Sequence, residues 1–518
     1  MRNFRSGLVA VVLIGGLTGL GGPVAAADTA FTLTATADSA NARITADEQG
    51  FSVESADFAH GFLTKTRLAR RLQTLGRHGV IRLGGYSMDL VWPAFGPYSG
   101  TEAPAWAIGG TVDQGDLDNL EELLKASGWK VTLGAPLKSV LDGSVTLDQV
   151  VSEVAAVRAT LGNDLLAVEL GNEYDHVTTL SAADYYATMK EYAAAIHARV
   201  PGAPLKMAGP SANTATTNTR LDEFVTAALA DTSTRPAGLL GELDSHWYPT
   251  SHCGSSSTSV PVLMSAATYT KARTKLQGIM AIGARLNPGV PMVVNESNTT
   301  SCSGQAGVSN TYATALWSLD YLLQTAQTGV RRLNFHTSTA AICGDLKPRD
   351  SADYPISYRF YAAFCAPDQA ALDAGKLSAA PLYYGLWAFR QVPHGRFLDL
   401  GLADADLGKL RAYGVADGGR STMVLINVQD PMASDSTADV VTVRLPDAYR
   451  WGRQITLRSA APGGLGSVDA TGITLGGRTV SDRGIPSGRP VATPVPVDGT
   501  SATVTVPPGT AQIITFSR

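Results

Sequence analysis

LLAVELGNE, residues 165–173, is a short apolar run that stops abruptly at Gly171, Asn172 and Glu173. Its first residues are typical of a buried strand, interrupted only by Glu169. In a parallel barrel, functional side chains sit at the carboxyl ends of the strands. The stretch therefore predicts a barrel strand that brings an asparagine and a glutamate to the mouth of the barrel.

Units of this kind recur along the chain, although no repeat has a fixed period. Short strand-like runs end in Gly, Pro or polar residues at 51–55, 79–85, 129–135, 165–173, 205–211, 243–249, 291–297 and 331–337. Helical segments lie between them, such as 117–128, whose leucines share one face. Eight strands that alternate with helices predict an α/β fold, a (β/α)8 or TIM barrel, over residues 51–385.

The pattern of the chain changes after the predicted barrel. Alternating, β-branched runs broken by Gly, Pro and Asp occupy 421–430, 439–448 and 501–518. They predict an antiparallel β-sandwich over residues 386–518. Residues 29–39 alternate in the same way. We therefore expect residues 28–50 to add an N-terminal strand to the distant sandwich.

The first residues have the pattern of a secretory signal peptide. Arg2 and Arg5 precede an apolar run over 7–20, and small residues then lead to a cleavage site after Ala27. A membrane anchor is the alternative, but the run is glycine-rich and shorter than the ~20 residues that a span needs. We expect residues 1–27 to be removed, so that the mature protein is secreted and extracellular, without a membrane partner.

Composition and motifs exclude several classes of function. Lys and Arg number 41 and Asp and Glu 45, so the formal net charge of -4 gives no electrostatic case for nucleic acid. RLGG at 82–85 lacks the pattern of a phosphate-binding loop. The chain has no G-x-S-x-G elbow for a serine hydrolase.

The four cysteines, an even number in an exported chain, predict two disulfides. None has the close spacing of a zinc site, and spacing alone permits more than one pairing. Cys253 and Cys302 follow the sixth and seventh strands, whose loops meet at the barrel mouth. We therefore predict a Cys253–Cys302 bridge and a separate Cys343–Cys365 bridge.

Glu173 has a counterpart, Glu296, in the seventh strand-like run, and each glutamate follows an asparagine, Asn172 or Asn295. Two carboxylates at one barrel mouth can flank a glycosidic bond. One protonates the leaving oxygen, and the other attacks the anomeric carbon or activates water, while the Asn172 amide can bond the sugar 2-hydroxyl. A single glutamate would more simply be a loop carboxylate or a helix-cap partner, but the paired placement favours catalysis.

Further candidates for sugar binding lie at other strand ends. Tyr248 could donate to Glu296 and His246 could contact the sugar. The alternatives are core packing for the adjacent Trp247 and a satisfied structural role for the histidine. His336 ends the eighth strand and has the same two interpretations. Glu54, near the end of the first strand, could accept hydrogen bonds from sugar hydroxyls or be a plain surface charge.

These features resemble a known family. GNE after the fourth strand, a glutamate after the seventh and a barrel joined to a sandwich are similar to the retaining glycosidases of clan A. The chain most resembles glycoside hydrolase family 79, which includes microbial β-glucuronidases and heparanases. The resemblance is carried by VIRLGGYS at 80–87, by residues 295–336 and by PLYYGLWAF at 381–389. It implies Glu173 as acid/base, Glu296 as nucleophile, net retention, and no metal or organic cofactor.

The resemblance also implies a carbohydrate substrate: an exo-acting β-glucuronidase would release glucuronic acid, or its 4-O-methyl form, from glycans or glycosides. Some glucuronidases of this branch contact the sugar carboxylate through a tyrosine shortly after the nucleophile, but here residues 297–304 read SNTTSCSG. No Arg or Lys lies between Glu296 and Arg331 either, which leaves backbone N–H groups around Ser301 to Gly304 to bind the carboxylate. A β-glucosidase-type specificity and a non-catalytic carbohydrate-binding surface protein are the alternatives.

Overall fold

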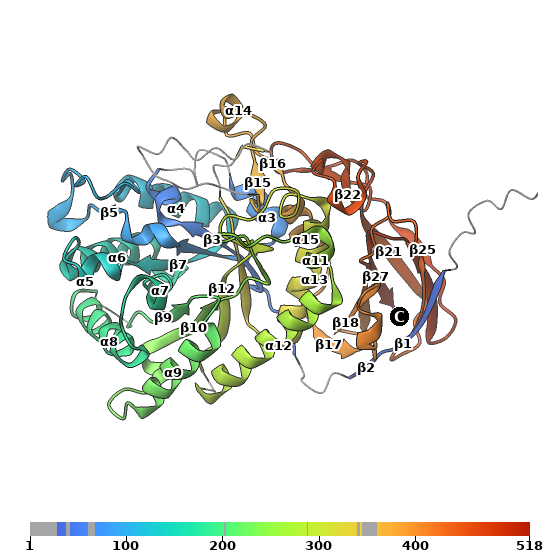
Figure 1. Cartoon of the computed structure of the whole chain (residues 1–518), viewed down its shortest axis with the longest axis horizontal. Coiled ribbons are helices and arrows are strands. Elements are labelled where there is room, and N and C mark those ends of the chain that lie inside the picture. The colour runs from blue at the N-terminus through green and yellow to red at the C-terminus, as the bar shows by residue number, and fades with distance from the viewer. Residues whose placement is uncertain are drawn as a thin grey trace, which may run out of the picture.

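The computed structural model describes residues 28–37, 42–60, 68–200, 202, 204–286, 289–338, 342–343 and 360–518. The predicted signal peptide, residues 1–27, lies outside these residues. Figure 1 shows a barrel surrounded by helices and, beside it, a separate pair of sheets. Within the described part of the chain, no helix combines the length and the apolar character needed to cross a membrane.

Eight parallel strands form a closed barrel, which confirms the predicted TIM-barrel fold. Neighbours in the chain are neighbours in the barrel, and β14 pairs with β3 to close it. In order the strands are β3 (Gln49–Glu54), β4 (Val80–Gly84), β7 (Lys130–Ala135), β8 (Leu165–Leu170), β9 (Met207–Ala212), β10 (Leu240–His246), β12 (Met292–Ser297) and β14 (Arg332–His336).

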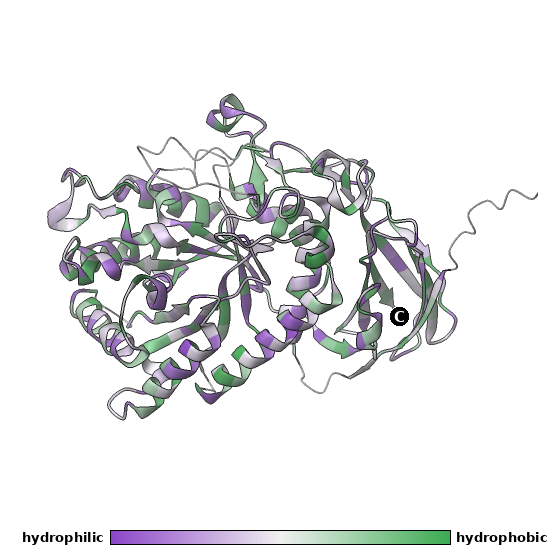
Figure 2. Ribbon diagram, viewed as in Figure 1, coloured by the Kyte–Doolittle hydropathy of each residue, from purple (hydrophilic) through white to green (hydrophobic). Residues whose placement is uncertain are grey.

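Helices cover the outside of the barrel, and their ribbons alternate between hydrophobic and hydrophilic residues in Figure 2. In most helices one face packs on the strands while the other meets water. The helices Tyr312–Gln327 and Pro381–Phe389, by contrast, are buried along nearly their whole length. The longer helices are α3 (Leu68–Leu75), α4 (Gln114–Ser127), α6 (Leu147–Leu161), α8 (Ala182–Arg199), α9 (Thr217–Ala230), α12 (Ala266–Gly283), α13 (Tyr312–Gln327) and α15 (Pro381–Phe389). The shorter ones are α1 (Ser55–Ala59), α5 (Lys138–Leu141), α7 (Tyr174–Val177), α10 (Pro236–Leu239), α11 (Val260–Leu263) and α14 (Gln369–Asp373).

Short strands form pairs in the loops that follow the barrel strands, and also in the C-terminal part of the chain. They are β5 (Trp92–Pro93) with β6 (Thr111–Val112), β11 (Thr250–Ser251) with β13 (Thr300–Ser301), β15 (Phe364–Cys365) with β16 (Ser378–Ala379), and β23 (Thr479–Val480) with β24 (Pro486–Ser487). The β11 and β13 pair joins the loops after the sixth and seventh barrel strands.

The C-terminal part is a sandwich of a smaller and a larger sheet. The smaller sheet is β1 (Thr29–Thr34), β20 (Asp439–Arg444) and β26 (Ser501–Val506). The larger sheet is, in order, β2 (Thr36–Ala37), β17 (Arg396–Asp399), β18 (Leu410–Asp417), β19 (Arg420–Asn427), β27 (Thr510–Ser517), β21 (Trp451–Ser459) and β22 (Ile473–Leu475), with β25 (Thr493–Val495) beside β21. The sandwich pairs are antiparallel except for β1 and β20, which run parallel from Thr29 opposite Asp439.

The barrel-facing side of the larger sheet joins the hydrophobic core of the barrel. Figure 1 shows α13 and α15 on the side of the barrel that faces the larger sheet. Val424 of β19 and Ile513 of β27 belong to the same buried cluster as the barrel residues. The Tyr312 hydroxyl at the start of α13 donates to the Gly509 carbonyl at 2.7 Å, and Tyr413 of β18 donates to Asp320 of α13 at 2.6 Å. The two parts are therefore packed as a single unit.

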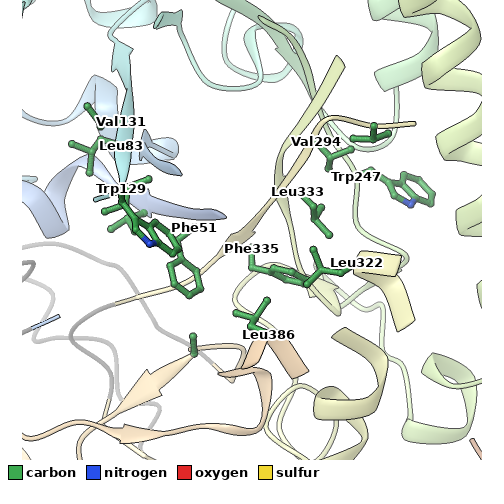
Figure 3. Packing of buried hydrophobic residues seen from close by; sticks show 14 of the residues in the cluster. Phe51, Leu83, Trp129, Val131, Trp247, Val294, Leu322, Leu333, Phe335 and Leu386 are labelled. Atoms are coloured by element: carbon green, nitrogen blue, oxygen red, sulfur yellow. The ribbon is translucent and has the colours of Figure 1, made fainter. Parts of the chain in front are cut away.

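Large apolar side chains pack on the outer surface of the barrel, against its first strands. Trp129, just before β7, is 1% exposed, and its ring stacks on Phe51 of β3 with centroids 5.6 Å apart (Figure 3). Its indole N–H donates to the Gly76 carbonyl at 2.8 Å, so its polar edge is also satisfied. This contact packs β3 and the start of β7 against the outer layer, while Ser52 and Arg82, which bond each other at 3.0 Å, face the interior.

Replacing this buried ring should lower stability strongly. We expect Trp129→Ala to reduce the free energy of unfolding by about 3–5 kcal/mol, because a large cavity remains where the ring packed. Denaturant unfolding of the purified chain measures the change. Trp451, which is 50% exposed, provides the matched control, and Trp451→Ala should stay within about 0.5 kcal/mol of the parent. Equal losses in the two variants would contradict the packing role of Trp129.

Candidate active site

The two predicted glutamates meet at the carboxyl ends of the barrel strands. Glu173 lies three residues beyond the end of β8, and its backbone N–H donates to the carbonyl of Ser211 in β9 at 2.9 Å. Its φ of 49° is in the left-handed region, a conformation that costs energy in a non-glycine residue and is often found at functional sites. Glu296 lies within β12. One carboxylate oxygen from each glutamate and one ring nitrogen of His246 all lie within 4.8 Å of one another.

Arg82 of β4 is the centre of the polar network below these carboxylates. Its side chain is fully buried, and Nη1 donates to Glu296 Oε2 at 2.6 Å. Nη2 donates to Glu169 Oε1 at 2.5 Å and to Asn172 Oδ1 at 2.8 Å. Because a guanidinium only donates, it fixes the carbonyl oxygen of Asn172 on itself and leaves the amide N–H groups of that residue for a ligand.

Glu296 is surrounded by groups that favour its ionised form. The Tyr248 hydroxyl donates to Oε1 at 2.9 Å, while His336 Nδ1 lies 3.6 Å from Oε2 and His246 Nδ1 lies 3.9 Å from Oε1. Burial by itself raises the pKa of Glu296. The side chains of His336, His246 and Arg82, followed by the Tyr248 hydroxyl, outweigh burial and hold the pKa of Glu296 below its ordinary value.

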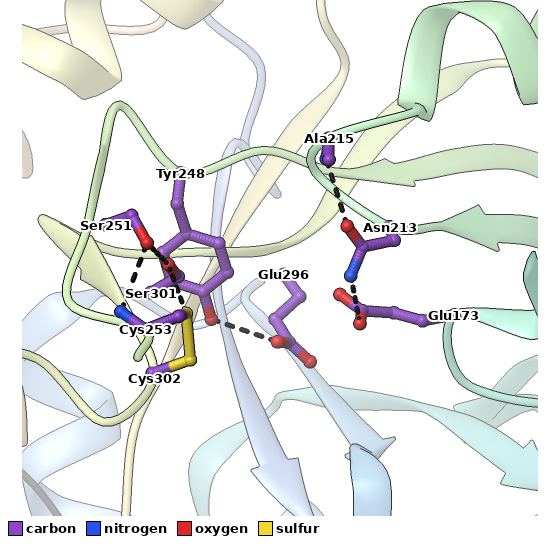
Figure 4. Close-up of a disulfide and its surroundings, with 9 residues drawn as sticks. All are labelled: Glu173, Asn213, Ala215, Tyr248, Ser251, Cys253, Glu296, Ser301 and Cys302. Carbon is purple, nitrogen blue, oxygen red and sulfur yellow. Dashed lines mark hydrogen bonds between the residues drawn. A yellow bond between two sulfur atoms is a disulfide. The ribbon is translucent and has the colours of Figure 1, made fainter. Parts of the chain in front are cut away.

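Glu173 has quite different partners. Its Oε1 lies 2.9 Å from His246 Nδ1, and its Oε2 accepts a hydrogen bond from Asn213 Nδ2 at 2.5 Å (Figure 4). Arg82 Nη2 approaches His246 Nε2 at 3.5 Å. An ionised carboxylate only accepts, so His246 Nδ1 carries the hydrogen when Glu173 is ionised. The two carboxylates thus share His246 but differ in every other neighbour.

Asn213 was missed by the sequence prediction, although it follows β9 directly. The rule that identified Glu173, a polar residue just beyond a barrel strand, applies to Asn213 as well.

The second asparagine of the Asn-Glu pairs has a structural role, since Asn295 Nδ2 donates to Glu169 Oε2 at 2.6 Å. Asn172 and Asn295 are therefore not equivalent, as their matching positions in the sequence had suggested.

Glu54 and His336 lie at the site and contact each other. His336 Nε2 is 3.4 Å from Glu54 Oε1, and its Nδ1 is 3.0 Å from Ser52 Oγ. Burial lowers the pKa of His336, but Glu296 and Glu54 reverse the shift and raise it above its ordinary value. Glu54 also accepts the backbone N–H of Ser87 at 2.9 Å. Glu54 is buried, so its interpretation as a plain surface charge is wrong.

Both predicted disulfides are confirmed. Cys253–Cys302 and Cys343–Cys365 have Cα separations of 5.3 and 4.9 Å. In Figure 4 the first bridge lies beside Tyr248, which points from it towards Glu296. The bridge therefore joins the loop that carries Tyr248 to the loop that follows Glu296.

The predicted carboxylate-binding loop has an unusual backbone. Ser301 Oγ bonds Ser251 Oγ at 3.1 Å and lies 3.2 Å from Cys253 Sγ, so this side chain braces the loop. Cys302, Ser303 and Gly304 then have φ angles of 57°, 70° and 77°. Three consecutive residues with positive φ make a tight turn at this point of the loop.

Glu173, His246 and Glu296 are also the group in the described residues whose atoms are close enough to hold a metal ion. The Arg82 guanidinium already lies 2.6 Å from Glu296. A second cation bound to this carboxylate would be repelled at short range in a buried site. The donor set therefore fits an organic ligand better than a resident metal.

No protein-family model matches the chain. A beta-glucuronidase from Aspergillus niger is 37% identical over 51 residues. The matched segment is 10% of this chain and spans only 9% of the length of that protein. The sequence relationship is thus local.

Solved structures of glycoside hydrolases share the whole fold. A 4-O-α-L-rhamnosyl-β-D-glucuronidase from Fusarium oxysporum 12S has a TM-score of 0.70 at 19% identity, over 94% of this chain and 100% of that one. A GH51 arabinofuranosidase from Xanthomonas axonopodis pv. citri has a TM-score of 0.61 at 13% identity, with 94% and 100% coverage. The GH39 enzyme of the same organism has a TM-score of 0.57 at 15% identity, with 97% and 100% coverage. The chain has the barrel-and-sandwich fold of these glycoside hydrolases.

Removing the central cation should destabilise the chain. Arg82→Met leaves Glu169 and Glu296 buried without their counter-ion, and we expect a loss of about 3–5 kcal/mol at neutral pH. Because the pKa of Glu296 is lowered in the folded chain, its contribution is complete above the ordinary carboxyl pKa of about 4.3 and is lost as the pH falls below it. Denaturant unfolding as a function of pH measures both effects.

The matched control is Arg285, whose ion pair with Asp222 is exposed. Arg285→Met should change stability by less than about 1 kcal/mol, because water and salt screen such pairs. Arg82→Lys should remain destabilised, since a single ammonium cannot reproduce the contacts with Glu169, Glu296 and Asn172. Full stability of Arg82→Met would show that the interior does not depend on the guanidinium.

Proposed function

We propose that the protein is a secreted, retaining exo-β-glycosidase, with β-glucuronidase activity as its favoured specificity. The observation that carries this proposal is the pair of unequal carboxylates at the barrel mouth, which bring one oxygen each to within 4.8 Å of the other. Retaining enzymes hold their two carboxyl groups about 5–5.5 Å apart, whereas inverting enzymes leave about 6.5–9.5 Å for a water molecule. The short separation supports retention.

The surroundings of the two glutamates support distinct roles. Glu296, held by Arg82 and Tyr248 with a lowered pKa, is the nucleophile, because an ionised carboxylate is needed to attack the anomeric carbon. Glu173 is the acid/base, since it contacts His246 and the neutral amide of Asn213 instead of the permanent cation that keeps Glu296 ionised.

The reaction then has two balanced steps. In the first, Glu296 forms a bond to the anomeric carbon while Glu173 gives its proton to the departing glycosidic oxygen. In the second, Glu173 takes a proton from water, and the resulting hydroxide displaces Glu296 to release the sugar with its original configuration. The amide N–H groups of Asn172 would bond the sugar 2-hydroxyl, which Arg82 permits by holding the other end of the amide.

The glucuronide specificity rests on three observations. One is the local match to the Aspergillus niger beta-glucuronidase, and another is the fold shared with the Fusarium oxysporum glucuronidase. The third is the tight turn from Cys302 to Gly304, whose backbone N–H groups we expect to bind the sugar carboxylate. The absence of Arg and Lys from residues 297–330 favours the alternative, a β-glucosidase-type specificity on the same catalytic pair. The two disulfides support the proposed export, because such bridges persist in oxidising compartments.

A panel of chromogenic β-glycosides tests the specificity. We expect kcat/KM for the β-glucuronide to exceed that for the β-glucoside and β-galactoside by about tenfold to a hundredfold, because hydrogen bonds to a charged group contribute ~1.5–3 kcal/mol. Faster hydrolysis of the β-glucoside would reject the glucuronidase and keep the glycosidase. No hydrolysis of any β-glycoside would favour the carbohydrate-binding protein instead.

Substitution of each glutamate tests the roles. Glu296→Gln should abolish turnover of every β-glycoside, because no glycosyl-enzyme forms. Glu173→Ala should still be glycosylated by substrates with good leaving groups, but deglycosylation should become limiting once the base is lost. Added azide needs no general base, so it should restore turnover of Glu173→Ala and yield a β-glycosyl azide.

The stereochemistry of the azide product, determined by NMR, is the critical measurement. Rescue should occur for Glu173→Ala and not for Glu296→Gln. A β-azide from neither variant, or substantial activity in Glu296→Gln, would place the catalytic pair elsewhere on the barrel mouth.

A further inference from the structure

The larger sheet of the sandwich has one face in the sandwich core and another turned to the barrel. Met423 of β19 and Ile514 of β27 pack in the core of the sandwich. Their neighbours Val424 and Ile513 point the opposite way and join the core of the barrel. In Figure 1 the strands β27 and β21 lie between the barrel and β1. The barrel-facing side of this sheet extends beyond the part that the barrel covers.

Strand register shows where this face emerges. Residues directly opposite each other in antiparallel strands share a face. Val424 of β19, Ile513 of β27 and Ile455 of β21 form one such row beneath the barrel, although Ile455 is only partly buried. Two rows further along, the same face carries Arg420, Ser517 and Trp451. Both Arg420 and Trp451 are exposed, so the face changes from apolar to basic and aromatic along its length.

A cleft of about 790 Å³ lies over this exposed end of the sheet. Its walls come from the sheet, from Trp387 and Gln391 at the end of α15, and from the segment around Arg478 and Val491. Ligand pockets typically measure about 300–1,000 Å³. Its lining includes none of the residues at the barrel mouth described above, so it is a separate site.

The cleft is strongly basic. Among the described residues that line it, four are arginines and none is Asp or Glu. Arg518 pairs with Asp447 outside the cleft at 2.6 Å, and Arg478 donates to the Pro486 carbonyl at 3.1 Å. The remaining two are Arg420 and Arg453.

Arg420 and Arg453 have free guanidinium groups. No side-chain hydrogen bond or ion pair joins either of them to a residue in the described ranges. Asp417 lies opposite Arg420 across the hairpin, yet the two make no ion pair within 4.0 Å in this part of the structure. Two unpaired guanidinium groups therefore remain to bind an anion, and planar carboxylates fit them in a bidentate way.

Trp451 adds an apolar contact surface beside the two unpaired guanidinium groups. Its indole is 50% exposed, a large apolar surface that the fold leaves uncovered. Trp451 and Arg453 are two residues apart on β21 and so share one face of the strand. A ring that stacks on Trp451 can therefore present a carboxylate to Arg453. The combination suits a polymer whose units each have an apolar ring face and a carboxylate.

We propose that this cleft is a second carbohydrate-binding site, which holds a uronic-acid-containing polysaccharide away from the barrel mouth. Duplex nucleic acid fits less well, because it carries one charge per about 1.7 Å of axis and would face a chain of net charge -4 with only two unpaired arginines in the cleft. The site does not depend on the proposed catalysis, since its ligand is bound and not cleaved there.

Binding of polygalacturonate tests the proposal. The full chain carrying Glu296→Gln, which should not hydrolyse glycosides, is titrated with polygalacturonate, dextran and duplex DNA by isothermal calorimetry. We expect binding of polygalacturonate, weaker or no binding of dextran and DNA, and loss of affinity as NaCl rises from about 0.01 M to about 1 M, over which the Debye length falls from about 30 Å to about 3 Å.

Variants in the cleft separate it from the barrel mouth. Trp451→Ala, and separately Arg420→Gln with Arg453→Gln, should each weaken polygalacturonate binding by up to about tenfold. Arg444, exposed on the smaller sheet, provides the control, and Arg444→Gln should bind like the parent. In the chain with an intact Glu296, Trp451→Ala should leave turnover of a small chromogenic glycoside unchanged.

Some results would overturn the second site. They are unchanged polygalacturonate affinity in the cleft variants, equal affinity for dextran, or tighter binding of DNA. Lack of turnover in the unaltered chain would contradict the proposed function alone, because the calorimetric comparison does not use catalysis.

Discussion

A single buried guanidinium organises the interior of this barrel. Arg82 is fully enclosed, and arginine cannot release its proton in a protein, so its charge is permanent. A buried charge of this kind is tolerated only when opposite charges and hydrogen-bond acceptors surround it. Carboxylates from β8 and β12 and an amide just beyond β8 supply them. The ends of strands that are far apart in sequence are therefore fixed relative to one another by one side chain of β4.

This arrangement explains the residue that interrupts the apolar run of β8. Glu169 is fully buried and lies 2.5 Å from Arg82, so it carries most of the neutralisation. Arg82 is thus already paired when Glu296 approaches it as a second anion. One edge of the Glu296 carboxylate is then free to meet a ligand. A further pair, Arg332 with Glu242 at 2.6 Å, lies among the same interior strands. Charged pairs replace part of the branched apolar packing that commonly fills such barrels.

The sequence was sufficient for those features that depend on periodicity and on strand ends. The barrel, the positions of Glu173 and Glu296 and both disulfides follow from the order of strands and from which loops meet. The central role of Arg82 could not be predicted in this way, because a lone arginine inside an apolar run does not show which of its neighbours will be buried with it. Asn213 was missed for a different reason, since the exact end of β9 decides whether it belongs to a strand or to the site.

The direction in which β1 pairs could not be predicted from the sequence either, and it has a consequence for how the chain folds. Alternation in residues 29–34 indicates a strand, but the parallel pairing of β1 with β20 depends on how the termini are brought together. Because Thr29 lies opposite Asp439, the first described strand has no partner until synthesis has passed residue 439. Contacts of such long sequence separation form late and slowly. Until β1 pairs with it, β20 has an open edge. The unfinished sandwich is then the part of the molecule most exposed to wrong pairing with another chain.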